Sequence, residues 1–188
     1  MKVGIINLNS GNLLSVISAL ENIGHQATVI NKPDSNFDAL IMPGQGRFAF
    51  VAAQLDRNGW RDFILNWIND NKKFIGICVG MQLLFENSDE DSHAIGLGVF
   101  KGSISKLKHA KTPMVGWAQL NSENTLLKDQ YVYFVNSYGI AQSTNCIATV
   151  NYGQDFCAAV QQGNLYGFQF HPEKSGNYGQ ELLKQCLK

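Results

Sequence analysis

The sequence predicts a single α/β domain, and three observations support this prediction. The chain has 188 residues, a length that one hydrophobic core can organise. Hydrophobic residues make up 45% of it, which is enough for a sizeable core. In the first half, short apolar runs alternate with segments of helical periodicity, as in parallel sheets. We therefore expect residues 1–188 to form one domain with a mostly parallel central sheet flanked by helices.

The elements of the first half follow from their periodicity. Strands are expected at residues 3–7, 27–30, 39–42 and 74–77, which are short apolar runs. Helices are expected at residues 13–23, 48–55, 60–68 and 79–85, where apolar side chains recur every three or four positions.

The second half is dominated by strand-like segments separated by turn residues. They lie at residues 96–104, 115–120, 131–138, 147–152, 156–161 and 165–170, and a helical pattern at 179–187 follows them. These strands can extend the parallel sheet or form an antiparallel layer, and the pattern leaves both arrangements open.

Composition and charge exclude several classes of partner and location. Fifteen basic residues balance fifteen acidic residues, which disfavours binding to nucleic acid or to an anionic membrane. No run reaches 18 apolar residues and the start lacks a signal-peptide pattern, so a cytoplasmic location is expected. The four cysteines form no CxxC pair, and in the cytosol all four are expected to be reduced: Cys78, Cys146, Cys157 and Cys186.

Cys78 is the first candidate catalytic residue, because it lies at the centre of a GxCxG motif. An apolar strand precedes it and a helical run follows, which is the pattern of a nucleophile elbow. Glycines two positions to either side let the backbone turn sharply without a Cβ clash. A buried structural cysteine beside two packing glycines is the alternative interpretation.

His171 and Glu173 form the second candidate pair, in the tripeptide His-Pro-Glu. If Pro172 holds the chain extended, the carboxylate of Glu173 can orient the His171 ring while its other nitrogen exchanges a proton with Cys78. The other histidines, His25, His93 and His109, are interpreted as surface residues.

A tight turn, PGQG at residues 43–46, is a candidate source of backbone amides for an oxyanion hole, although Pro-Gly turns are common. Metal binding is disfavoured, since His171 and Glu173 fall short of a zinc ligand set. The chain also has no Walker loop and no GxGxxG motif, so no cofactor is expected. Together, cysteine, histidine and glutamate suggest acyl transfer.

These motifs resemble those of class I glutamine amidotransferases. The resemblance lies in GICVGMQLLF around Cys78, PGQG at 43–46 and FQFHPEKSG around His171, and it covers nearly the whole chain. Within that class, five further motifs are similar to those of the glutaminase subunits of imidazole glycerol phosphate synthases: GNL at 11–13, GMQ at 80–82, GW at 116–117, SY at 137–138 and KSG at 174–176. The resemblance implies the single-domain fold of this class.

The resemblance also implies a role for each matching residue. Cys78 attacks the side-chain amide of glutamine, His171 delivers a proton to the departing ammonia, and Glu173 orients His171. Gln82 and Glu90 hold the polar ends of glutamine, helped by the backbone at Ser137 and Tyr138. Backbone amides at Gly44, Gln45 and Val79 stabilise the oxyanion.

A partner and a pathway are implied in the same way. In this family a (β/α)8 barrel synthase receives the ammonia and makes imidazole glycerol phosphate and aminoimidazole carboxamide ribotide in histidine biosynthesis. The two subunits form a heterodimer, and Asn12, Tyr138 and Lys174 are implied at the interface. Two alternatives remain. A related cysteine peptidase is disfavoured by the GMQ and KSG motifs, and a regulatory pseudoenzyme is disfavoured by the intact triad.

Four residues depart from the usual family pattern: Asn7, Gln45, Ala118 and Asn136. We hypothesise that they face the partner. In that case the chain would be a paralogue that supplies ammonia to a different barrel synthase, such as one that amidinates a surface-polysaccharide sugar.

Overall fold

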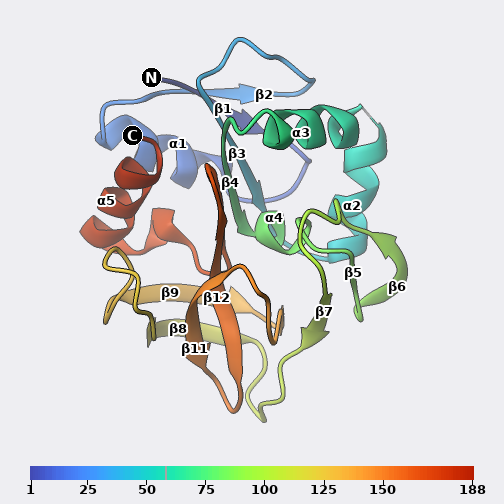
Figure 1. Cartoon of the computed structure of the whole chain (residues 1–188), viewed down its shortest axis with the longest axis vertical. Helices are drawn as coiled ribbons and strands as arrows, with labels where there is room; N and C mark the ends of the chain where they lie inside the picture. Colours follow the sequence, from blue (N-terminus) through green and yellow to red (C-terminus); the bar gives the residue numbers. More distant parts are fainter. Residues whose placement is uncertain (58) are drawn as a thin grey trace.

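The computed structural model describes residues 1–57 and 59–188 and is built around a seven-stranded sheet (Figure 1). In spatial order its strands are β11 (Cys146–Asn151), β12 (Asp155–Gln162), β13 (Leu165–Phe168), β4 (Lys73–Cys78), β3 (Ala39–Gly44), β1 (Lys2–Ile6) and β2 (Gln26–Ile30). The strands from β13 to β2 are mutually parallel, whereas β12 and β11 add antiparallel pairings at one edge. The predicted fold class is therefore confirmed.

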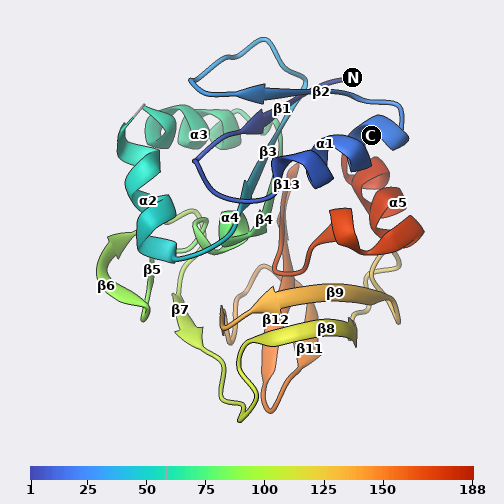
Figure 2. The same cartoon turned by 180° about the vertical axis from the view of Figure 1, so that it is seen from behind.

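Helices cover both faces of this sheet. In two opposite views, α1 (Leu13–Asn22) and α5 (Gly176–Cys186) lie on one face, and α2 (Phe48–Arg57) and α3 (Trp60–Asn69) lie on the other (Figures 1 and 2). Helix α1 begins at an Asn12 cap, whose side chain accepts a hydrogen bond from Ser15 N at 3.4 Å. Within the described part of the chain, no helix combines the length and apolar character needed to span a membrane.

The central strands β3 and β4 position the site. Every residue of β3 is buried, as expected for a parallel strand covered by helices on both faces. A short helix, α4 (Val79–Gln82), turns directly off the end of β4 and packs against β3. The approach is so close that a Cβ built on Gly80 would lie 1.8 Å from Met42 O, so only glycine fits there.

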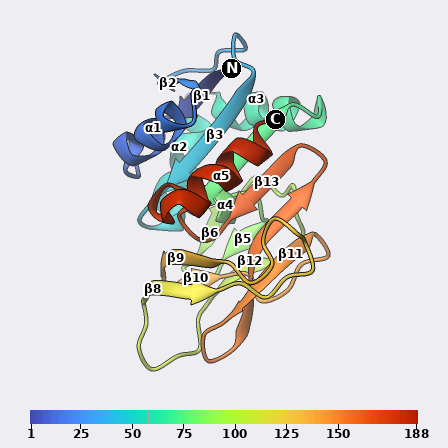
Figure 3. The same ribbon diagram turned by 90° about the vertical axis from the view of Figure 1, so that its left-hand side faces the viewer.

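The second half supplies two further layers beyond the carboxyl ends of the parallel strands. One is a small sheet of β10 (Tyr138–Gly139), β7 (Ser103–Lys106), β5 (Asn87–Ser88) and β6 (Asp91–Ile95). The other is an antiparallel ribbon of β8 (Met114–Gln119) and β9 (Tyr131–Asn136) (Figure 3). Both arrangements left open by the sequence therefore occur, since β11 to β13 join the main sheet and the ribbon stands apart.

Two predicted elements in this half need correction. The strand expected at 96–104 is wrong for most of its length, because residues 96, 97, 98 and 100 instead donate backbone hydrogen bonds to carbonyls that follow α4, such as Leu97 N to Leu83 O at 2.6 Å. The strand expected at 131–138 is interrupted at Ser137, between β9 and β10. The expected helix at 79–85 is only the single turn of α4, and a short 3₁₀ helix, η1 (Pro172–Lys174), was not predicted.

The cysteines also differ from expectation. Cys146 and Cys157 lie on the antiparallel strands β11 and β12 with their Cα atoms 5.8 Å apart, and they form a disulfide. The prediction that all four cysteines are reduced is therefore wrong for this pair, whose Cα separation lies in the range of a disulfide. Cys78 and Cys186 are free and buried.

A test of the close approach at Gly80 is its replacement by alanine. Because the added Cβ meets the Met42 carbonyl, Gly80→Ala should lower the free energy of unfolding by about 3 kcal/mol or more. Gly24→Ala is the matched control, since Gly24 has a φ of +82° but open space at the Cβ position, and about 1 kcal/mol is expected there. Equal losses in urea denaturation would contradict the steric argument.

Candidate active site

Cys78 lies at the junction of β4 and α4, as the motif predicted. Its backbone has φ 56° and ψ −112°, an unusual conformation for a residue with a side chain, and its side chain is almost buried. Such a conformation costs on the order of 1–3 kcal/mol and persists only where surrounding packing enforces it. Here the approach of α4 to β3 enforces it, and the predicted strand–turn–helix geometry around Cys78 is present.

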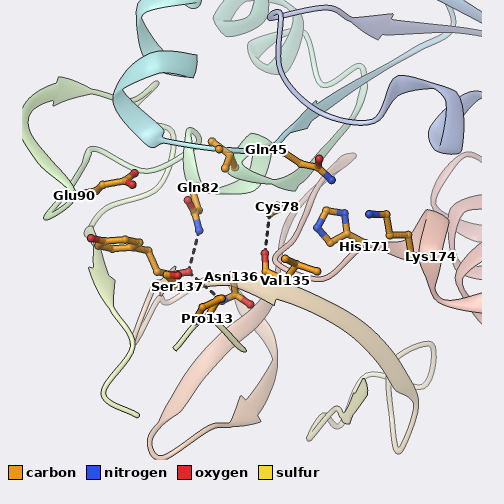
Figure 4. A pocket seen from close by; sticks show the side chains of 13 residues that line it. Gln45, Cys78, Gln82, Glu90, Pro113, Val135, Asn136, Ser137, His171 and Lys174 are labelled. Carbon is orange, nitrogen blue, oxygen red and sulfur yellow. Dashed lines mark hydrogen bonds between the residues drawn. The ribbon is translucent and has the colours of Figure 1, made fainter. Parts of the chain in front are cut away.

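His171 and Glu173 form the expected pair, although not for the expected reason. His171 Nδ1 is 2.8 Å from Glu173 Oε1, and both side chains are at most 3% exposed. The chain is not extended through this pair, because residues 172–174 form η1, and its turn brings the carboxylate back to the ring. The same turn places His171 beside Cys78 (Figure 4). Since Nδ1 is engaged by Glu173, Nε2 is the ring nitrogen left for the thiol.

The environment of His171 favours its protonated form. Burial by itself lowers the pKa of the ring, but interactions with Cys78 and Glu173 outweigh it and raise the pKa to about 9. A protonated imidazole is the state that can deliver a proton to a leaving group. The pair therefore supplies general-acid chemistry next to a candidate nucleophile.

A pocket of about 360 Å³ opens at Cys78. Its lining includes most of the residues that the sequence singled out, namely Gln45, Cys78, Val79, Gln82, Glu90, Ser137, Tyr138, His171 and Lys174. Figure 4 labels all of these except Val79 and Tyr138. Three others lie outside the lining. Glu173 is behind His171, Gly44 is paired with Cys78 at the end of β3, and Asn12 caps α1.

Gln82 has a fixed orientation in this pocket. Its Nε2 donates to Tyr138 O at 3.0 Å and to Gln169 Oε1 at 2.9 Å, so both hydrogens of the amide are engaged. Tyr138 O also accepts from Asn136 Nδ2 at 3.0 Å. The Tyr138 carbonyl is thus occupied by protein groups, and Oε1 is the atom of the Gln82 amide that remains for a ligand.

Glu90 is held at the far end of the pocket from His171 (Figure 4). Its Oε2 accepts a hydrogen bond from Phe48 N at 2.7 Å, at the first residue of α2, and Oε1 lies 3.8 Å from Arg47 Nε. Because α2 directly follows the PGQG turn, Glu90 braces the segment that carries Gln45. A carboxylate here can also attract the ammonium group of an amino acid.

Sequence reasoning missed three residues at this site. Pro113 and Val135 line the pocket but belong to no chemical motif, so the sequence carried no signal for them. Gln169 is fully buried, with Nε2 3.8 Å from Cys78 Sγ. A signal for Gln169 did exist, because it precedes His171 by two positions in extended chain and therefore points to the same side.

The remaining histidines do not join the site. His93 is exposed, as expected, and His109 stacks on Tyr152 with ring centroids 4.0 Å apart. His25 is partly exposed, although both its ring nitrogens are covered and burial lowers the pKa of the ring. No cluster of three or more His, Cys, Asp or Glu side chains in residues 1–57 and 59–188 could hold a metal ion.

The four departures from the family pattern do not share one face. Gln45 and Asn136 line the pocket, and Asn136 is buried. Asn7 donates through Nδ2 to Asn31 Oδ1 at 2.8 Å, beyond the end of β1. Ala118 packs against the core on the inner side of the ribbon. The hypothesis that all four face a partner stays a prediction.

A buried elbow cysteine, an oriented histidine and a small polar pocket are typical of a glutamine-hydrolysing amidotransferase. The family model "Glutamine amidotransferase class-I" matches residues 5–188, and the chain belongs to this family.

Within the family the chain is similar to HisH proteins. It is 40% identical to the imidazole glycerol phosphate synthase subunit HisH of Staphylococcus aureus, over 98% of this chain and 95% of that protein. The HisH subunit of Prochlorococcus marinus is 41% identical, over 100% of this chain and 98% of that protein.

Solved structures agree on the fold. A glutamine amidotransferase crystal structure aligns with a TM-score of 0.79 at 20% identity, covering 98% of each chain. The structure of PurLQS from Thermotoga maritima aligns with a TM-score of 0.78 at 18% identity, covering 99% of this chain and 97% of that one.

The raised pKa of His171 predicts a pH-dependent stability. The pKa of His171 is about 9 in the folded state and near 6.5 in the unfolded state. The contribution of protonated His171 to the free energy of unfolding is therefore complete below pH 6.5 and is lost as the pH rises through 9. Its size is on the order of 3 kcal/mol, at 1.36 kcal/mol per pKa unit. Urea denaturation on both sides of this window should show the loss in the wild type and not in His171→Gln. Parallel pH profiles for the two proteins would contradict the assignment.

Proposed function

We propose that the chain is the glutaminase subunit of an imidazole glycerol phosphate synthase, acting through Cys78, His171 and Glu173. The observation that carries the proposal is the meeting of these three residues at one pocket, in a chain that matches HisH subunits over its full length. Glutamine and water are converted to glutamate and ammonia, and the ammonia passes to a partner.

The chemistry proceeds in two stages. Cys78 passes its thiol proton to His171 Nε2 as Sγ bonds to the amide carbon of glutamine, and the amide oxygen becomes an oxyanion. Backbone amides at Gly44, Gln45 and Val79 would stabilise this oxyanion, and Gln45 and Val79 line the pocket. The carbon–nitrogen bond breaks as His171 Nε2 gives its proton to the leaving nitrogen, releasing ammonia and leaving a γ-glutamyl thioester. Water, deprotonated by His171, then attacks the thioester, and glutamate leaves as Cys78 recovers its thiol.

The pocket provides complementary ends for a free amino acid. Glu90 and the Gln82 oxygen can accept hydrogen bonds from the α-ammonium group, at the end of the pocket away from His171. The side-chain amide then lies at Cys78. This arrangement distinguishes glutamine from a peptide, whose α-nitrogen carries no charge.

The ribbon of β8 and β9 is the proposed docking surface for the barrel partner. One face of it is exposed and apolar, because Val115 pairs with Val135 and Trp117 pairs with Tyr133 across the two strands. Val135 also lines the pocket, so a partner on this face would cover the pocket mouth next to Lys174. Ammonia could then leave without meeting bulk water, where it would be protonated. A cytoplasmic location is proposed with this role.

The function is tested by mixing the chain with the barrel synthase encoded by the same organism. We expect glutamine-dependent formation of imidazole glycerol phosphate, abolished in Cys78→Ala but restored there by ammonium salts. If no such product forms while Cys78-dependent glutaminase activity appears with a different barrel protein, the sugar-amidinating paralogue is the better account. A glutamine-like electrophile that fails to label Cys78 would favour the pseudoenzyme.

The docking surface is tested by Trp117→Ala. Removing an exposed anchor of the ribbon should weaken partner binding at least about tenfold, measured by calorimetry, with little change in melting temperature. Phe50→Ala is the matched control, since Phe50 is a similarly exposed aromatic residue (52% against 56%) on α2, away from the ribbon. Equal effects of the two variants would place the partner elsewhere.

A further inference from the structure

Gln169 lies between the two parts of the site that act on substrate. It is fully buried at the end of β13, and its side chain is within reach of both Gln82 and Cys78. Neither the triad nor the residues carried over by resemblance include it. A buried amide has four hydrogen-bonding positions to satisfy, so its placement here needs a reason.

The direction of each amide in this network follows from one backbone carbonyl. Tyr138 O can only accept, so the atom of Gln82 that is 3.0 Å from it must be the nitrogen. That same nitrogen lies 2.9 Å from Gln169, which must therefore present its oxygen to it. The nitrogen of Gln169 is then left to face Cys78 Sγ, at 3.8 Å.

We propose that Gln169 is a positioning residue with two effects: it donates an N–H to the Cys78 sulfur and it holds the Gln82 amide with its oxygen toward the substrate. The inference rests on the proposed function, in which Cys78 is the nucleophile. It adds that the attacking sulfur and the substrate-binding amide are coupled through one buried side chain.

The donor should matter most when the sulfur is negative. An N–H group directed at a thiolate favours the charged form over the thiol, and hydrogen bonds to charged groups are about twice as strong as those between neutral groups. Gln169 directs this donor at the sulfur from a fully buried position, whereas the Cys78 thiol itself faces Val135 O at 3.8 Å. Loss of the Gln169 donor should therefore slow the reaction of Cys78 with electrophiles.

Two variants separate the two effects. Gln169→Glu keeps an acceptor for Gln82 but replaces the donor with an oxygen, so it should lower kcat at least about tenfold with little change in KM. Gln169→Met removes both interactions, so KM for glutamine should rise as well. Met is close to Gln in length and apolar, and this variant remains informative if the buried charge of Gln169→Glu prevents folding.

The deciding measurement is the pH dependence of Cys78 alkylation by iodoacetamide, together with glutaminase kinetics in the presence of the barrel partner. The midpoint of alkylation should move upward by about one pH unit in Gln169→Met, corresponding to a tenfold loss of thiolate. Gln54→Met is the matched control, because Gln54 is also buried but does not line the pocket. Cys78→Ala gives the background from Cys186, whose pKa is raised to about 12 by burial.

A wild-type alkylation midpoint and an unchanged KM in Gln169→Met, with a lower melting temperature, would overturn the inference and leave Gln169 a packing residue. Failure of the proposed function would look different. The wild-type complex would then release no glutamate from glutamine, or Cys78→Ala would release it as fast, and the inference would fall with it.

Discussion

The close packing of α4 against β3 is the constraint on which the rest of the site depends. Because a Cβ at Gly80 would meet Met42 O, the chain must turn through glycine as it leaves β4. That turn forces Cys78 into a conformation with positive φ and directs its side chain toward the pocket, beyond the end of the sheet. The position of the nucleophile is therefore set by the sheet itself, with Gln82 on the helix that follows it, whereas His171 and Glu173 reach it from a separate element.

His171 and Glu173 come from the second half of the chain, and the contacts of this segment hold it against the ribbon. His171 N donates to Tyr133 O at 2.9 Å, which fastens the end of β13 to the ribbon. Ser175 Oγ closes η1 by donating to His171 O at 2.7 Å, and this keeps Glu173 against the imidazole ring. The tautomer and charge of His171 thus depend on a turn whose own hydrogen bonds are buried.

The sequence predicted the sheet, the main helices and the triad, because these depend on short-range patterns. Alternating apolar runs located β1 to β4, and the glycine spacing around Cys78 identified the elbow. The apolar run at 96–104 misled the prediction, since it is buried under the residues that follow α4 rather than paired as a strand. Gln169 was missed because its importance comes from the orientation of Gln82, which only the Tyr138 carbonyl determines. The disulfide joins two strands at a place where their pairing is irregular, and local pattern gives neither the pairing nor its irregularity.

The central claim is that Cys78 forms a covalent bond with glutamine, and trapping that intermediate tests it most directly. The complex with its barrel partner is mixed with glutamine, quenched in acid during turnover, and analysed by mass spectrometry of the peptide that contains Cys78. A γ-glutamyl group on Cys78, and none on Cys186, is the expected result. Steady release of glutamate with no modified Cys78 at any quench time would contradict the mechanism.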